Sequence, residues 1–327
     1  MITSEDQFID GLKGARVLVT GATGFIGAQL THRLVSAGAL VAIMHRATSS
    51  LHRLADLPQL DTFVADLRDE QAITRAVQTI QPRFVFHLAA AVDVSRDSRK
   101  SQEMIENNLN GTINLLNALQ GIEYQRFVNT GTCEEYGDNP VPFHEAQNFN
   151  PVSPYSASKA AATLFCQMLH KTSKLPIVTV RPFLTFGPNQ NLQRLIPQAI
   201  MAALDNRNLP MTEGVQTREF NYVSNIVDGF LLTALNPNVP GEIINIGCGE
   251  PYTLREVVSL IYELTGSSGK PNFGELEYRS GESFAFFCDN TKSREMLQWY
   301  PRVGLREGLE RTISWYRDHR DRGVIVR

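Results

Sequence analysis

The feature that most constrains the fold is a glycine-rich turn between a short apolar strand and a helix. The predicted strand covers residues 16–20, the turn has the sequence G-A-T-G-F-I-G, and an amphipathic run follows to residue 38. The first glycine permits a sharp turn, the second lets a pyrophosphate approach, and the third lets the helix pack on the strand. The helix N-terminus then faces the anion. Unless the turn is purely structural, it predicts a dinucleotide site formed by Gly21, Thr23, Gly24, Phe25, Ile26 and Gly27.

Strands and helices alternate through the first half of the chain, with further strands predicted over residues 40–44, 61–65, 83–86, 126–130 and 177–181. A helix is predicted from about residue 101 to 120. This alternation is typical of an α/β fold with a Rossmann-type, doubly wound parallel sheet. Beyond residue 182 we expect short mixed elements: a helix over 195–204, strands over 217–223 and 243–247, and a helix opened by a capping box near residue 253.

These patterns predict two domains with some chain crossing between them. A dinucleotide-binding Rossmann domain is expected over residues 1–181, carrying the catalytic set, and a smaller mixed α/β substrate domain over residues 182–327. A formal charge of −3 favours neither nucleic acid nor an anionic membrane as a partner. The chain has no apolar run of about 18 residues and its first residues do not resemble a signal peptide, so we expect a cytoplasmic protein. Four cysteines without C-x-x-C spacing indicate neither a metal site nor a disulfide framework.

The end of the second strand predicts which dinucleotide is preferred. NAD sites usually place Asp or Glu here to hold the ribose hydroxyls, whereas this chain has His45 followed by Arg46. A guanidinium attracts the 2′-phosphate that a carboxylate would repel. We therefore expect NADP(H) to be preferred. NAD(H) is the alternative, in which Arg46 is only a solvated loop charge.

Further candidate cofactor residues follow the third and fourth strands. Asp66 and Leu67 fall where a turn would contact adenine. Leu88, Ala89 and Ala90 lie where small side chains leave room for a cofactor across the sheet. A buried amide at Asn108 is expected to brace its helix against the cofactor side. His87 is expected to be a structural histidine with its hydrogen bonds satisfied.

Tyr155 and Lys159 lie four residues apart in a stretch rich in alanine and serine, which favours a helix. Residues at this spacing share one helix face. An ammonium near a phenol stabilises the phenolate, which lowers the tyrosine pKa from about 10 towards a range useful for acid–base chemistry. A surface tyrosine beside a solvated lysine is the simpler alternative for this pair alone.

The order of the motifs resembles the extended short-chain dehydrogenase/reductases, in the branch of nucleotide-sugar epimerases, dehydratases and reductases. From roughly residue 14 to 317 the chain carries T-G-x-x-G-x-x-G, D-L, H-L-A-A, N-x-x-G-T, Y-x-x-x-K, R-P…G-P and R-x-F-x-Y-V. The resemblance implies a Rossmann domain that holds NAD(P) and a C-terminal domain that holds a nucleoside-diphosphate sugar. It also implies a homodimer formed through a four-helix bundle.

The resemblance assigns roles to individual residues. Tyr155 would exchange a proton with a sugar hydroxyl while hydride passes between the sugar carbon and nicotinamide, and Lys159 would lower its pKa and hold the nicotinamide ribose. Thr132 would donate a hydrogen bond to the same sugar oxygen, and Thr130 and Pro182 would lie on the cofactor side. Expected substrate contacts are Val92, Thr132, Glu134, Leu184, Arg218 and Arg279. Leucine at 184 stands where such proteins often have a substrate-contacting asparagine.

The pair Cys133-Glu134 leaves the reaction open between two outcomes. The pattern Thr-x-Glu is similar to 4,6-dehydratases, in which the carboxylate removes the C5 proton and its neighbour helps to protonate the departing hydroxyl; a thiol, with a pKa of about 8.5, differs from the usual acid. The same run is also similar to 4-keto-sugar reductases. We favour redox-neutral dehydratase or epimerase chemistry at C4. The alternatives are an NADPH-dependent 4-keto-sugar reductase and, in another class, a non-catalytic NADP-sensing protein.

Overall fold

A seven-stranded sheet forms the centre of the computed structural model, which describes residues 10–57, 60–278 and 281–321. Its strand order is β11-β6-β5-β4-β1-β2-β3, and all neighbouring strands are parallel. The carboxyl ends of the strands therefore meet at one edge, where doubly wound sheets bind their ligands. The strands are β1 (Arg16–Thr20), β2 (Leu40–His45), β3 (Asp61–Val64), β4 (Phe84–His87), β5 (Arg126–Thr130), β6 (Ile177–Pro182) and β11 (Ile243–Ile246).

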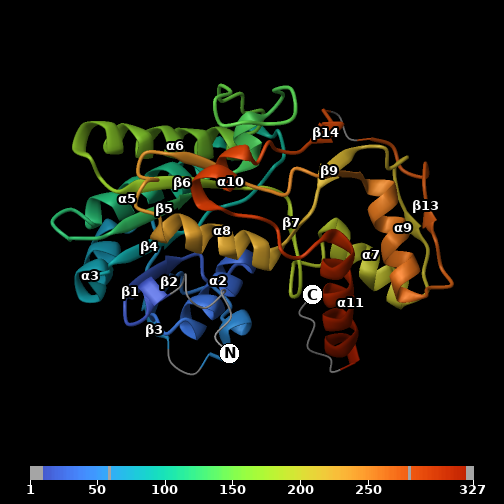
Figure 1. The fold of residues 1–327 in the computed structure, drawn as a ribbon, viewed down its shortest axis with the longest axis horizontal. Helices are drawn as coiled ribbons and strands as arrows, with labels where there is room; N and C mark the ends of the chain where they lie inside the picture. Colours follow the sequence, from blue (N-terminus) through green and yellow to red (C-terminus); the bar gives the residue numbers. More distant parts are fainter. Residues whose placement is uncertain (1–9, 58–59, 279–280, 322–327) are drawn as a thin grey trace.

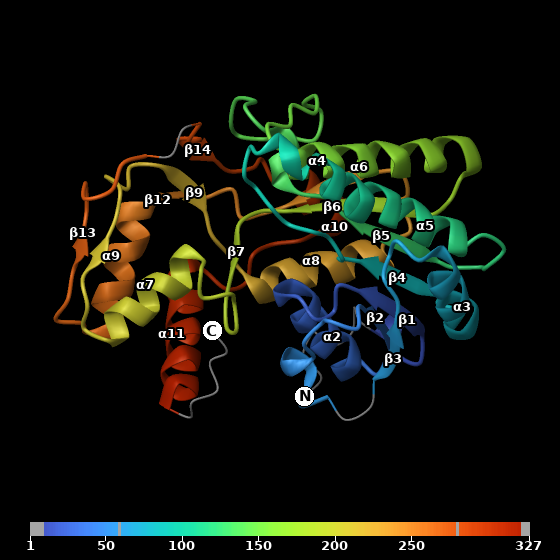
Figure 2. The same ribbon diagram turned by 180° about the vertical axis from the view of Figure 1, so that it is seen from behind.

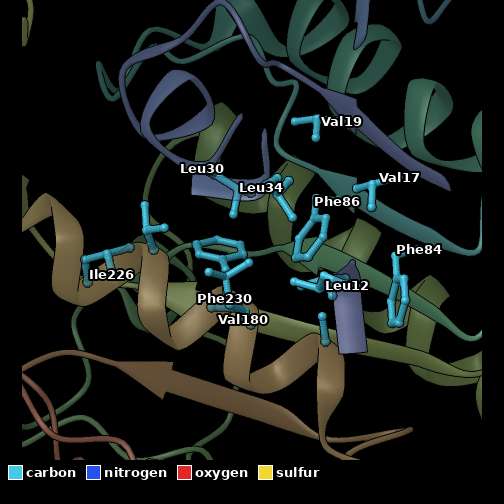
Figure 3. Packing of buried hydrophobic residues seen from close by; sticks show 14 of the residues in the cluster. Leu12, Val17, Val19, Leu30, Leu34, Phe84, Phe86, Val180, Ile226 and Phe230 are labelled. Carbon is cyan, nitrogen blue, oxygen red and sulfur yellow. The ribbon is translucent and has the colours of Figure 1, made fainter. Parts of the chain in front are cut away.

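Helices cover both faces of the sheet, because successive side chains of each buried strand point to opposite faces. Val17 and Val19 of β1 pack into the core shared with α2 and α8, which Figure 3 shows from close by. Leu18 packs into the core on the opposite face, shared with α3, α5 and α6. The covering helices are α2 (Phe25–Ser36), α8 (Val223–Leu235) and α10 (Thr291–Leu297) on one face, and α3 (Glu70–Ile80), α5 (Gly111–Ala118) and α6 (Pro154–Ser173) on the other (Figure 1). The predicted fold class is confirmed.

A second hydrophobic core lies beside the sheet and is built by α7 (Leu195–Leu204), α9 (Leu254–Thr265) and α11 (Leu305–Asp321). Figure 2 shows these helices grouped at one end of the molecule. The predicted capping box of α9 is present, with the Thr253 hydroxyl accepting from the Glu256 amide. Short strands complete this part: β7 (Thr185–Phe186), β8 (Leu209–Pro210), β9 (Thr217–Glu219), β10 (Asn221–Tyr222), β12 (Pro251–Thr253), β13 (Pro271–Asn272) and β14 (Ala285–Phe286).

Two expected elements differ from the structure. The strand expected over residues 217–223 is divided into β9 and β10, because β9 pairs with β12 and β14 whereas β10 pairs with β7, and Val223 already begins α8. The helix expected over 101–120 consists of α4 (Ser101–Met104), a π-helical segment (Ile105–Asn110) and α5. Such π-helical insertions often occur at functional sites. Within the described part of the chain, every helix is too short or too polar to span a bilayer.

Candidate active site

The glycine-rich turn between β1 and α2 has a conformation that side chains would prevent. Gly21 adopts a φ of +74°, and a Cβ there would lie 2.5 Å from the Ala89 amide nitrogen. A Cβ on Gly27 would lie 2.1 Å from the Gly21 carbonyl oxygen. Because Gly24 precedes the first residue of α2, Phe25, the free amides of the helix N-terminus point out of this turn. The turn thus forms a compact anion cradle at the carboxyl edge of the sheet.

Charged residues gather at the ends of β2 and β3. His45 ends β2, and the exposed Arg46 follows it. Asp66 accepts hydrogen bonds from Arg68 at 2.8 and 2.9 Å, which lower the pKa of Asp66 to about 2, with Arg46 acting in the same direction. The sequence analysis did not single out Arg68. Arg46 and Asp66 therefore lie near each other, as residues that contact one adenosine would.

Leu67 is fixed by contacts with α5. The Asn114 amide donates to the Leu67 carbonyl at 2.9 Å, and a Cβ on Gly111 would lie 2.9 Å from the Leu67 Cβ. The Leu67 side chain is partly buried against the core. Close packing against this glycine thus holds the turn at the expected adenine position.

Asn108, in the π-helical segment, connects the loop after β4 with α6, the helix of Tyr155 and Lys159. Its amide accepts from the Ala91 nitrogen at 2.8 Å and donates to the Ala91 oxygen at 3.0 Å and to the Ser158 hydroxyl at 2.9 Å. The expected brace is thus present, although its contact with a cofactor stays a prediction. His87 is fully buried between the hydroxyls of Thr20 and Thr112, at 2.7 and 2.9 Å, so its structural role is confirmed.

The expected catalytic residues meet where β5 ends and α6 begins. Thr132 caps the short turn after β5, and Tyr155 and Lys159 lie on the first two turns of α6, which a Ser153 capping box opens. The Tyr155 phenol lies close enough to the Thr132 hydroxyl for that hydroxyl to influence its pKa. All three side chains are buried. Thr130 is the last residue of β5, and its buried hydroxyl has no hydrogen-bond partner in the described chain.

Burial sets the direction in which the pKa values of Tyr155 and Lys159 are shifted. Desolvation raises the pKa of Tyr155, and the nearby Thr132 hydroxyl acts against that shift. Desolvation also lowers the pKa of Lys159, with Glu135 acting against it. The expected lowering of the Tyr155 pKa by Lys159 is therefore wrong for this structure, in which burial raises that pKa.

A buried ion pair behind the catalytic turn was missed in the sequence analysis. Glu135 is fully buried, and its carboxylate lies 2.7 Å from the Arg181 guanidinium. The same carboxylate accepts from the Thr132 amide at 2.8 Å and from the Thr163 hydroxyl at 3.2 Å. The ion pair thus fixes the backbone of Thr132, an expected catalytic residue, from behind. The adjacent glutamates in the sequence offered only a weak signal, because nothing there indicates which carboxylate points inwards.

Glu134 and Cys133 have different surroundings. Glu134 is partly buried, which raises its pKa, while the charges of Arg218 and Arg96 act against that shift. Cys133 packs with an aromatic cluster that includes Phe183. Burial raises the pKa of the Cys133 thiol well above its usual value, with Glu134 adding to the effect.

The expected substrate residues are only partly accounted for. Val92 and Leu184 are exposed, as substrate contacts in an open site would be. Arg218 is already paired with Glu282 at 3.0 Å, and Arg279 lies outside the described residues. Arg96, which the sequence analysis did not consider, donates to the Gly281 carbonyl at 2.9 Å.

Comparison with known proteins decides the family. Residues 17–247 match the model of the NAD dependent epimerase/dehydratase family. The chain belongs to this family. It is 31% identical to a human dTDP-D-glucose 4,6-dehydratase, over 94% of this chain and 93% of that protein. The structure is similar to a UDP-glucose 4-epimerase from Thermotoga maritima with UDP-glucose, with a TM-score of 0.86 and 26% identity, over 92% of this chain and 98% of that chain. It is also similar to a UDP-glucose 4-epimerase from Thermus thermophilus with NAD, with a TM-score of 0.82 and 28% identity, over 92% of this chain and 99% of that chain.

The residues present fit the cofactor of this NAD-dependent family. The glycine cradle accepts an anion, and the unpartnered hydroxyl of Thr130 is available at the carboxyl end of β5. Pro182 ends β6, which is separated from β1 and its turn by β5 and β4. These residues line the same sheet edge as Tyr155 and Lys159. The family's enzymes act on nucleotide sugars, so this chain is an enzyme of that class.

Proposed function

We propose that this enzyme exchanges hydride at C4 of a nucleoside-diphosphate hexose without net oxidation or reduction, as a dehydratase or epimerase. The observation that carries the proposal is the burial of Tyr155 beside Thr132 at the end of β5, with Lys159 one helical turn further along α6. A bound nicotinamide would supply the hydride acceptor and later return the hydride. Tyr155 would exchange a proton with the C4 hydroxyl, and Thr132 would donate a hydrogen bond to the same oxygen.

Glu134 supports the redox-neutral outcome. Its carboxylate follows the catalytic Thr132 by two residues, and partial burial raises its pKa. A base whose pKa lies closer to neutral accepts a proton more readily at working pH. Once C4 is a ketone, the C5 proton is acidic, and Glu134 would remove it.

NADPH-dependent reduction of a nucleotide-4-keto-sugar is the second candidate, and two observations favour it. The buried Cys133 thiol, with its raised pKa, is a poor acid for a departing hydroxyl. Arg46, at the end of β2, suits a 2′-phosphate and hence the reducing NADPH pool.

One experiment separates the candidates. The purified enzyme would be incubated with nucleoside-diphosphate hexoses and with 4-keto-sugars, while the reduced-nicotinamide absorbance and the product mass are followed. Loss of water, or epimerisation without a net absorbance change, supports the proposal. Stoichiometric NADPH consumption establishes the reductase, and no turnover with any nucleotide sugar contradicts both.

Glu134→Gln is expected to affect the two reactions differently. Elimination or epimerisation through C5 should fall by about 10²–10⁴-fold, the usual contribution of a general base, because an amide cannot take the proton. Reduction of a 4-keto-sugar should change little, since Tyr155 supplies its proton. Solvent deuterium uptake at C5 measures the elimination or epimerisation, and the rate of keto-sugar reduction measures the second reaction. Wild-type deuterium uptake in the variant would exclude Glu134 as the base.

NADP(H) is proposed as the preferred cofactor. Arg46 is exposed at the end of β2 and close enough to Asp66 to lower its pKa, so its guanidinium lies at the predicted adenosine position. A 2′-phosphate at the end of β2 would be attracted by Arg46 and would not be repelled by a carboxylate of β2. Titration of the enzyme with NADPH and NADH measures the preference. Equal or tighter binding of NADH would contradict it.

A homodimer is also proposed, formed through the helices beside β5. Leu164 and Met168 lie one turn apart on α6 with exposed fractions of 50% and 41%, and Ile105 nearby is 43% exposed. Apolar side chains grouped in this way are typical of a protein interface. Light scattering should give twice the mass of one chain, and Leu164→Glu should give one chain's mass. A monomeric wild type would contradict the proposal.

A further inference from the structure

Arg53 connects the glycine-rich turn to the C-terminal part of the chain. It lies in a short 3-10 helix, His52–Leu54, after β2, and its side chain is partly buried. Its guanidinium donates to the Thr23 carbonyl at 3.3 Å and to the Asn189 carbonyl at 3.1 Å. The first carbonyl belongs to the turn that is predicted to hold the dinucleotide. The second belongs to the loop that follows β7.

A second hydrogen bond holds the same loop from the other side. The Tyr316 hydroxyl of α11 donates to the Gln190 carbonyl at 2.6 Å. In both views the segment after β7 lies between α2 and α11 (Figures 1 and 2). Gly187, at its start, packs closely enough that a Cβ would meet Val223 at 2.7 Å and Phe25 at 3.5 Å. The loop is thus held between two parts of the molecule.

The charge of Arg53 is not neutralised by the protein. In residues 10–57, 60–278 and 281–321, both of its hydrogen bonds go to carbonyl groups and it forms no ion pair with a carboxylate. Burial lowers the pKa of Arg53, which shows that the cation is partly desolvated. A partly buried guanidinium beside the anion cradle is stabilised when an anion occupies that cradle.

The held loop leads directly to the predicted substrate residues. β7 pairs with β10 in parallel register, with Thr185 opposite Asn221, and the Asn221 amide donates to the Leu184 carbonyl at 2.9 Å. Arg218 precedes β10 in the adjoining strand β9. A shift of the loop would therefore move the backbone of Leu184 and, through β10, the chain next to Arg218.

We infer that Arg53 is a positioning residue that couples dinucleotide binding at the glycine turn to nucleoside-diphosphate binding in the C-terminal part. The inference rests on the proposed function for the identity of the second ligand. Coupling between two sites is reciprocal, so each ligand tightens the binding of the other by the same factor. A guanidinium suits this role because its Nε and Nη1 donors reach the two carbonyls from fixed, separate positions, whereas the donors of an ammonium all lie on one nitrogen.

The test measures coupling in the full chain. NADPH would be titrated with and without saturating UDP or dTDP in wild type, Arg53→Gln, Arg53→Lys and the exposed control Arg75→Gln on α3. We expect wild type and the control to bind NADPH about fivefold or more tightly with the diphosphate present. Both Arg53 variants should show less than about a twofold effect. Unchanged coupling in Arg53→Gln, full coupling in Arg53→Lys, or none in wild type overturns the inference.

Hydrogen exchange tests the connection without a second ligand. With NADPH bound, amides of residues 187–194 should exchange roughly tenfold faster in Arg53→Gln than in wild type, because opening of the loop no longer breaks the hydrogen bond from Arg53 to the Asn189 carbonyl. Tyr316→Phe should accelerate the same amides, and Arg75→Gln should not. Unchanged exchange in Arg53→Gln overturns the inference. Failure of the wild type to bind any nucleoside diphosphate would instead refute the proposed substrate class, and the exchange data would still decide whether Arg53 holds the loop.

Discussion

Replacing Tyr155 by phenylalanine should lower kcat by about 10²–10⁴-fold, the range for losing a positioned general acid–base group. Phenylalanine keeps the ring that fills the buried position and removes only the hydroxyl, which lies beside Thr132. Stopped-flow measurement of hydride transfer, with saturating nucleotide sugar, gives the rate of the chemical step. The same loss should appear in both half-reactions, because Tyr155 takes and returns one proton.

The control for this prediction separates catalysis from binding and folding. Cofactor affinity and the urea midpoint of Tyr155→Phe should stay close to wild type, since the ring and the helix contacts remain. Thr132→Val is the matched variant, because it removes the hydroxyl beside the phenol. It should lower kcat less than the loss of the phenol does. Near-normal hydride transfer in Tyr155→Phe would show that another group carries the proton.

The fold was largely predictable from the sequence, because it depends on local patterns. The apolar run before Gly21 and the glycines themselves predict β1, the turn and α2, and the structure shows the positive φ and the close contacts that require glycine. The short elements after residue 182 were harder to predict. β9 and β10 separate only because they pair with different strands, and such long-range pairing leaves no periodic signal in a single sequence.

The site was predictable only in part, for the same reason. Tyr155 and Lys159 are marked by helical spacing, so their common face follows from the sequence. Which of two adjacent glutamates is buried depends on residues far away in the chain: Glu135 meets Arg181, 46 positions later. Arg53 and Arg96 are likewise identified only by the distant carbonyls they contact. Long side chains on loops give no pattern from which such partners can be inferred.

Glu135→Gln should destabilise the protein by about 3–5 kcal/mol, because it leaves the Arg181 guanidinium buried without its counter-charge. Both side chains are buried, and one guanidinium nitrogen of Arg181 already has no hydrogen-bond partner in the described chain. Urea unfolding, followed by circular dichroism, gives the change in free energy from the midpoint and slope. Glu263→Gln is the matched control, since its pair with Arg306 at 2.9 Å is exposed and should contribute about 1 kcal/mol or less.

A double variant distinguishes a buried ion pair from a merely well-packed glutamate. Removing both charges in Glu135→Gln with Arg181→Met leaves no unpaired ion, so the double variant should be less destabilised than the sum of the two single variants. Strict additivity would show that the two charges do not interact. The glutamine can still accept from the Thr132 amide, which Glu135 holds at 2.8 Å. The double variant should therefore keep more hydride-transfer activity than Glu135→Ala, in which that amide loses its acceptor and the catalytic threonine its fixed position.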